Sequence, residues 1–131
     1  MISTLIRLAS GLAPGRGFKT HDLEADLRAQ DWRGTDRRGP RGEVELAVWS
    51  RGAYRLEVEV KDYGDELVGL RSLELYAAGV KMGDIPIRPG GKSEFVRTDA
   101  DGILGFAPAP GVEMALVSGG VAVMAGRFRR D

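Results

Sequence analysis

The segment from residue 43 to residue 60 alternates apolar and polar side chains strictly, and this pattern constrains the fold most. Its regularly spaced apolar positions are Val44, Leu46, Val48, Leu56, Val58 and Val60. Successive side chains of a strand point to opposite faces, so this alternation indicates two strands with one buried and one wet face. The short link Ser50–Ala53 contains Gly52 and has the length of a hairpin turn. The segment therefore predicts an antiparallel β-hairpin.

Further short apolar segments follow, separated by turn signals at intervals of eight to twelve residues. They span 73–77, 93–98, 112–117 and 121–124. About seven strands at this spacing predict a mainly β fold, an antiparallel β-sandwich, with an open barrel as the alternative. Beyond the hairpin, we expect the core to include Leu73, Leu75, Val112, Met114 and Leu116.

Residues 1–42 differ in composition from the rest of the chain. Thr20 is a suitable helix N-cap, and Leu23 and Leu27 have the i, i+4 spacing of one helix face. This pattern predicts a short N-terminal helix over about residues 21–32, ended by Gly34. We therefore divide the chain into an N-terminal arm with this helix (1–42) and a β-sandwich domain (43–131).

Length and composition exclude several classes of function. The 131 residues fit one domain, and 19 basic residues balance 19 acidic ones, so no net charge steers the chain toward nucleic acid. No aromatic platform or recognition-helix pattern for nucleic acid accompanies the arginines. The chain has no Cys and one His, which excludes disulfides, thiolate zinc sites and multi-histidine metal sites. The nearly uncharged stretch 103–126 contains two Pro and five Gly, so we expect no membrane span there.

A Gly-rich loop after the predicted helix carries four arginines, Arg33, Arg37, Arg38 and Arg41. Arginine forms paired hydrogen bonds with carboxylates and phosphates. We favour a solvated linker as the interpretation of this loop, and docking onto an acidic partner comes second. We take these four residues as candidate contacts to an acidic protein partner.

The loop Asp99-Ala100-Asp101-Gly102 is the best candidate for a metal site. Asp99 and Asp101 could both face a cation, but calcium needs six to eight oxygen ligands, and Ile103 and Leu104 follow where an EF-hand would continue with acids. A turn closed by Asp side chains is the alternative interpretation. A carbohydrate-binding surface is also conceivable, built from Trp49, Tyr63 and Tyr76.

Four glutamates share the wet face of the predicted hairpin: Glu43, Glu45, Glu57 and Glu59. A pair of carboxylates at such spacing serves glycosidases as acid and nucleophile. General-acid work needs a pKa raised by burial, which an open strand face does not provide. We therefore expect a solvated face and no enzyme activity.

The chain from residue 42 to residue 128 resembles small bacterial all-β modules of immunoglobulin-like or transthyretin-like type. The resemblance is carried by the Glu/Val-rich hairpin, the segments 73–83 and 98–106, Pro110-Gly111-Val112 and the closing Gly126-Arg127-Phe128. It implies a β-sandwich and brings no catalytic residues.

Together these patterns predict a non-enzymatic protein-interaction or assembly module, such as an accessory subunit of a larger complex. The expected partner is another protein or further copies of this chain. The alternative is a calcium- or carbohydrate-binding β-sandwich module. The sequence assigns no cofactor and no cellular compartment.

Overall fold

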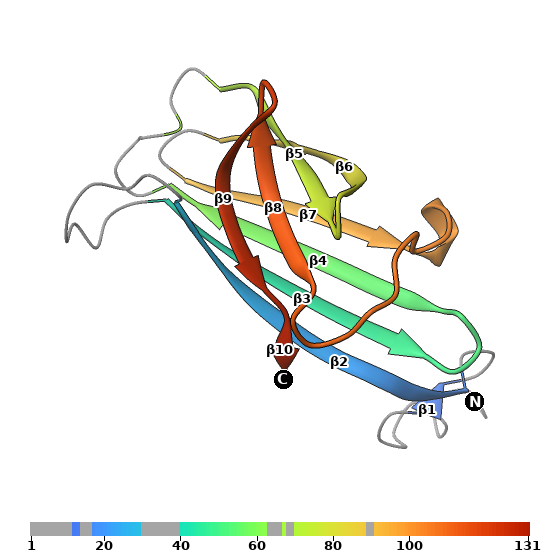
Figure 1. Ribbon diagram of the computed structural model, residues 1–131. Coiled ribbons are helices and arrows are strands. Elements are labelled where there is room, and N and C mark those ends of the chain that lie inside the picture. The colour runs from blue at the N-terminus through green and yellow to red at the C-terminus, as the bar shows by residue number, and fades with distance from the viewer. Residues whose placement is uncertain (1–11, 14–16, 30–39, 63–66, 68–69, 89–90) are drawn as a thin grey trace.

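The computed structural model describes residues 12–13, 17–29, 40–62, 67, 70–88 and 91–131, which form one antiparallel sheet that nearly closes on itself (Figure 1). The strands are β1 (Leu12–Ala13), β2 (Gly17–Ala29), β3 (Arg41–Trp49), β4 (Tyr54–Lys61), β5 (Ser72–Ala77), β6 (Val80–Pro86), β7 (Lys92–Thr98), β8 (Glu113–Ser118), β9 (Val121–Arg127) and β10 (Arg129–Arg130). Their order is β6-β5-β8-β9-β2-β3-β4-β7, and β1 and β10 also pair with β2. The predicted mainly β class is confirmed, with more strands than the expected seven.

The predicted helix over residues 21–32 is wrong, because residues 17–29 form the long strand β2. Leu23, Ala25 and Leu27 are buried, and the residues between them face outward. Leu23 and Leu27 share a face in a strand as well as in a helix, since a spacing of four fits both periods. This segment pairs with β3 on one side and with β9 and β10 on the other, and this pairing stabilises the strand over a helix. Residues 17–29 therefore lie in the same sheet as strands β3 to β9.

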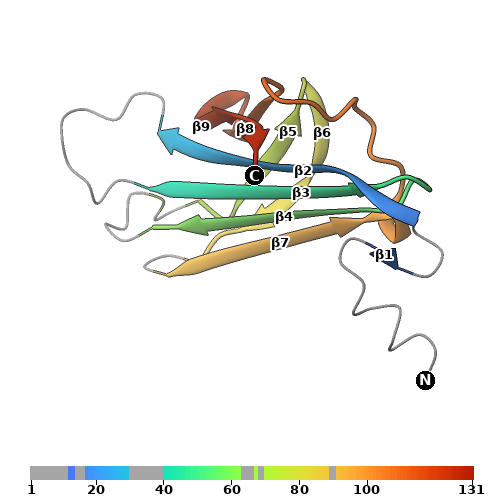
Figure 2. The same ribbon diagram turned by 90° about the horizontal axis from the view of Figure 1, so that it is seen from below.

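The sheet folds into two layers around one core. Strands β2, β3, β4 and β7 lie side by side in this order (Figure 2), and β8 and β9 run steeply across their direction (Figure 1). The predicted core residues are buried except Val48 and Val112, which are partly buried. One layer contributes Leu27, Leu46 and Leu56, and the other contributes Leu75 and Leu116, all fully buried. The inner face of the long strands is therefore occupied by core packing.

The two ends of the strand order, β6 and β7, meet without a backbone ladder. Pro86 at the end of β6 fits this edge position, because proline has no backbone N–H to donate to a ladder. Side chains of β7 close the seam instead. The Phe95 ring packs against Gly83, and the Arg97 guanidinium donates hydrogen bonds to the carbonyl oxygen of Met82 at 3.3 Å and to the hydroxyl of Tyr54 at 3.1 Å.

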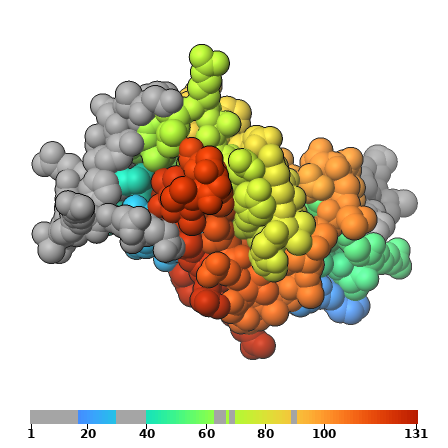
Figure 3. Space-filling view, turned by 45° about the horizontal axis from the view of Figure 1, so that its top comes forward, coloured from blue at the N-terminus to red at the C-terminus, as the bar shows by residue number. Residues whose placement is uncertain are grey.

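The C-terminal segment fastens the second layer to β2. Strand β10 pairs with β2 in the register that β9 sets, so β10 continues β9 past Phe128. Phe128 is buried and its ring stacks on Phe106 at 6.4 Å between centroids. This contact fixes the long connection from residue 102 to residue 112, which lies beside β5, β6, β8 and β9 on the face shown in Figure 3. Among the described residues, no helix has the length and apolar character needed to cross a membrane.

Candidate functional site

The outward side of β2, β3, β4 and β7 carries charges in rows that run across the strands. An acidic row contains Asp26, Glu43, Glu59 and Glu94, each directly opposite the next on the neighbouring strand. Beside it lies a basic row of Arg28, Arg41, Lys61 and Lys92, paired across the strands in the same way. A second acidic row, Glu24, Glu45 and Glu57, follows on the other side. We call these eleven residues the charged face.

The local sequence explains why these side chains share one surface. In β2, β3 and β4, buried apolar residues alternate with charged ones, so burial of the apolar set forces the charged set outward. In β7, Ser93 is buried while Lys92 and Glu94 are exposed. Like charges directly opposite each other on paired strands destabilise a sheet. The rows are therefore an arrangement that folding alone does not favour.

Ion pairs compensate only part of this charge. Arg129 contacts Glu24 at 2.8 Å and Asp26 at 3.2 Å. Lys61 contacts Glu59 at 3.2 Å, and Lys92 contacts Glu59 at 3.5 Å. Further pairs are Lys92 with Glu94 at 3.3 Å and Arg55 with Glu57 at 3.3 Å. The carboxylates of Glu94 and Glu59 raise the pKa of Lys92.

In the middle of the charged face, fewer of the charges are balanced by ion pairs. Glu43, Glu45, Arg28 and Arg41 make no ion pair with any residue that the structure describes. Three of these four lie on β3, which has β2 on one side and β4 on the other. Both unpaired cations and unpaired carboxylates are thus available to a partner here.

Glu45 shows the electrostatic cost of this arrangement directly. Desolvation raises the pKa of its carboxyl above the ordinary value of 4.5, and repulsion from Asp131, Glu57, Glu24 and Asp22 raises it further. Desolvation is the largest cause of the raised pKa, and the concentration of carboxylates around Glu45 adds to it. A cationic group placed against Glu45 would lower its pKa and relieve this repulsion.

Glu24, Glu45 and Asp131 could in principle hold a metal ion, since each offers a carboxylate oxygen within 4.8 Å of the others. The guanidinium of Arg129 already contacts Glu24 and supplies positive charge at this position. Exposed acidic groups of this kind are common without an ion. Two of its three members, Glu24 and Glu45, belong to the charged face, and we do not treat the cluster as a separate site.

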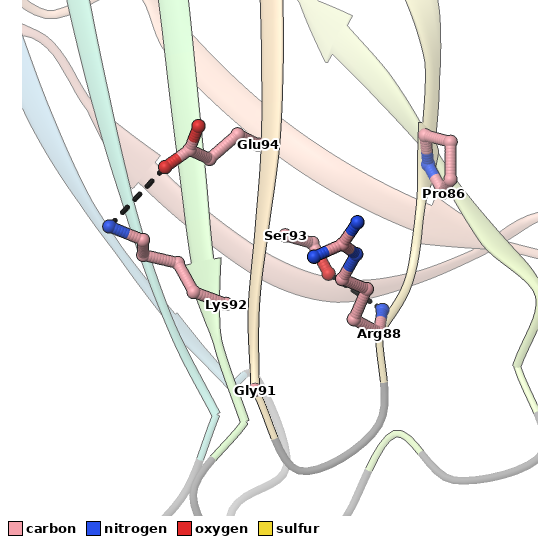
Figure 4. A pocket seen from close by; sticks show the side chains of 6 residues that line it. All are labelled: Pro86, Arg88, Gly91, Lys92, Ser93 and Glu94. Atoms are coloured by element: carbon pink, nitrogen blue, oxygen red, sulfur yellow. Dashed lines mark hydrogen bonds and ion pairs between the residues drawn. The ribbon is translucent and has the colours of Figure 1, made fainter.

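A recess of about 660 Å³ lies near the β6–β7 seam (Figure 4). It is lined by Pro86, Arg88, Gly91, Lys92, Ser93 and Glu94. The Ser93 hydroxyl accepts a hydrogen bond from the backbone N–H of Arg88 at 2.8 Å, and Lys92 and Glu94 pair with each other. The recess thus adjoins the charged face at β7, while its polar groups bond mainly among themselves.

Asp99 and Asp101 lie in a 3₁₀ turn, η1 (Asp99–Asp101), directly after β7. Asp101 accepts a hydrogen bond from the backbone N–H of Thr98 at 2.9 Å, and the Thr98 hydroxyl accepts one from Ala100 at 3.3 Å. Asp99 accepts a hydrogen bond from the backbone N–H of Tyr54 at 3.2 Å. Both carboxylates therefore have one oxygen engaged in holding the turn and the start of β4 together.

Of the four arginines predicted to contact a partner, Arg41 belongs to the basic row and is exposed. Arg33, Arg37 and Arg38 lie outside the described residues. Among the aromatic residues considered for sugar binding, Trp49 contacts the Lys19 ammonium and Tyr76 donates a hydrogen bond to Glu74. Tyr63 also lies outside the described residues.

The sequence patterns placed four carboxylates of the charged face together, those of the hairpin 43–60. They missed Glu24, Asp26 and Arg28, because residues 21–32 were interpreted as a helix. The alternation of Leu23, Ala25 and Leu27 with charged residues was the signal that could have identified them. Lys92 and Glu94 join the face only because β7 pairs with β4, which local sequence does not specify.

Comparison of the chain with protein-family models finds no match, and comparison with curated proteins finds none either.

Proposed function

We propose that this protein is a non-enzymatic interaction or assembly module that docks through the charged face. The observation that carries the proposal is the cross-strand alignment of like charges in adjacent acidic and basic rows. Such alignment costs stability in the isolated sheet, and an oppositely patterned partner relieves it. Core packing occupies the inner face of β2, β3, β4 and β7, so a partner of these strands would reach their outer face.

Electrostatic complementarity of this kind favours specificity and association rate more than raw affinity. The unpaired carboxylates on β3 are suited to basic side chains of a partner, and Arg28 and Arg41 are suited to its acidic ones. An accessory subunit that joins a larger complex reversibly and in a fixed register fits these properties.

A capture experiment tests this proposal. The wild-type chain and a Glu43→Gln/Glu45→Gln variant are immobilised and exposed to native-cell lysate at low ionic strength. We expect the wild type to retain a protein, identified by mass spectrometry and rebound in purified form, that the variant loses. Glu113→Gln on β8, outside the charged face, is the matched control. Equal retention by wild type and double variant would contradict the proposal.

The alternative proposal is a calcium-binding module that uses Asp99 and Asp101. Each carboxylate has one oxygen that accepts no hydrogen bond from the described residues, so each retains a possible ligand atom. Calorimetric titration with calcium tests it. Heat of binding that disappears in Asp99→Asn/Asp101→Asn would support it, and absence of heat with the intact chain would remove it.

A further inference from the structure

The basic row and the acidic row are matched in number and in position. Each of the strands β2, β3, β4 and β7 contributes one cation and one carboxylate, two residues apart on the same face. On β3 these are Arg41 and Glu43. Two residues of a strand span about 7 Å, so the rows run parallel at that separation.

This pattern is complementary to itself. A twofold axis that lies between the two rows, parallel to them and to the sheet surface, exchanges the rows of two facing copies. The basic row of one copy then lies over the acidic row of the other, strand by strand, and the contacts occur twice, as in any isologous interface. We infer that the partner of the charged face is a second copy of this chain, bound in this face-to-face arrangement.

The second copy supplies ion-pair partners that the described residues of a single chain do not. Arg41 and Glu43 make no ion pair with the described residues, although most of their neighbours on β4 and β7 do. In the proposed dimer, Arg41 of each copy faces Glu43 of the other. These two reciprocal contacts give both residues an ion-pair partner that they lack among the described residues of one chain.

The area of the charged face determines how tightly we expect the two copies to bind. Four strands about 4.8 Å apart and three rows about 7 Å apart cover roughly 400 Å² on each copy. A standard stable interface buries about 800 Å² on each partner. The dimer should therefore be weak and dissociate as ionic strength rises, because salt screens exposed charges.

Charge exchange at β3 tests the inference, which rests on the proposed function. Arg41→Glu or Glu43→Arg alone places like charges across the interface, so each should weaken self-association at least about tenfold at low ionic strength. A mixture of the two single variants should form a heterodimer, and the double variant Arg41→Glu/Glu43→Arg should regain self-association. Sedimentation velocity measures all four samples, and Glu113→Lys and Arg127→Glu on the other layer serve as controls.

The single variants are not expected to lose their fold. Arg41 lies opposite Arg28 and Lys61, and Glu43 lies opposite Asp26 and Glu59, so each reversal removes repulsion within the chain. Thermal unfolding of the dilute variants should therefore show equal or higher stability. A merely structural role for these residues would give the opposite result.

A wild-type chain that stays monomeric at low ionic strength would overturn the second-copy inference. So would single variants that self-associate like the wild type. Either result leaves the proposed function intact if Glu43→Gln/Glu45→Gln still loses an identified partner in the capture experiment. Failure of both experiments would remove the proposed function as well.

Discussion

Glu45 is the residue at which the electrostatics of the charged face are most visible. The folded state raises its pKa, mainly through desolvation and then through neighbouring carboxylates, and therefore holds its proton more tightly than the unfolded chain does. This contribution to stability is complete below the ordinary carboxyl pKa. It is lost as pH rises through the raised pKa, so the ionised residue works against folding at neutral pH.

Glu45→Gln should therefore be more stable than the wild type at neutral pH. We expect a gain of roughly 0.2–1 kcal/mol, the range of cross-strand pair effects, reduced at high salt because Glu45 is exposed. The gain should disappear in acid. Urea unfolding at several pH values measures it, with Glu113→Gln as the control that shows no gain. A wild type as stable as Glu45→Gln at neutral pH and low salt would show that the repulsion is negligible.

Asp101 has a structural role that is independent of any metal. Its carboxylate caps η1 by accepting the Thr98 N–H, and the Thr98 side chain reciprocates at Ala100. Asp101→Ala should lower the free energy of unfolding by about 0.5–2 kcal/mol, the usual cost of a lost cap. Chemical denaturation in the presence of a calcium chelator checks this. If the loss appears only when calcium is added, the cap is not what Asp101 provides.

Among the elements, the β6–β7 seam is the place where the sheet depends on side-chain packing. A Cβ atom at Gly83 would lie 2.6 Å from Phe95 Cζ and 2.8 Å from Cε1. The ring is partly buried and packs against the core, which restricts its movement. The close approach of backbone and ring therefore requires glycine.

Gly83→Ala should destabilise the protein by about 1–3 kcal/mol, the usual cost of overpacking. Gly91→Ala, near the other end of the seam, is the matched control, since its Cβ would meet nothing closer than 3.9 Å. Phe95→Leu in the Gly83→Ala background should restore part of the loss, because the shorter side chain makes room. Thermal unfolding of the wild type and the three variants measures these effects. Equal unfolding midpoints for Gly83→Ala and Gly91→Ala would show that the seam is loosely packed.

The elements that the sequence predicted correctly are those with local signals. The hairpin of β3 and β4, with Gly52 at a φ of 87°, follows from alternation and turn chemistry alone. Strand β2 was mistaken for a helix because the spacing of Leu23 and Leu27 fits both structures, and long-range pairing made the choice. Five of the eleven residues of the charged face were missed because long-range strand pairing places them. The rows depend on which strands are neighbours, and strand order is a property of the whole sheet.

At the scale of the whole molecule, the chain has no net charge, but its charged residues are arranged in rows locally. The charges of the 19 basic and 19 acidic residues cancel. The eleven of them that form the charged face are nevertheless separated into rows of one sign. Salt should therefore affect association far more than folding, because core burial holds the fold together. We expect the unfolding midpoint of the dilute chain to change little between low and high ionic strength, while complexes with any partner dissociate.

Carboxyl-group footprinting tests the central claim, that the charged face is the interaction surface, most directly. The protein is labelled with the same carbodiimide and amine at low ionic strength, once at a concentration at which it is assembled and once after dilution to a concentration at which it is dissociated. The account predicts that Glu43 and Glu45 are protected in the assembled state, and that Asp84 and Glu113, outside the face, label equally in both. Equal labelling of Glu43 and Glu45 in the two states would contradict it.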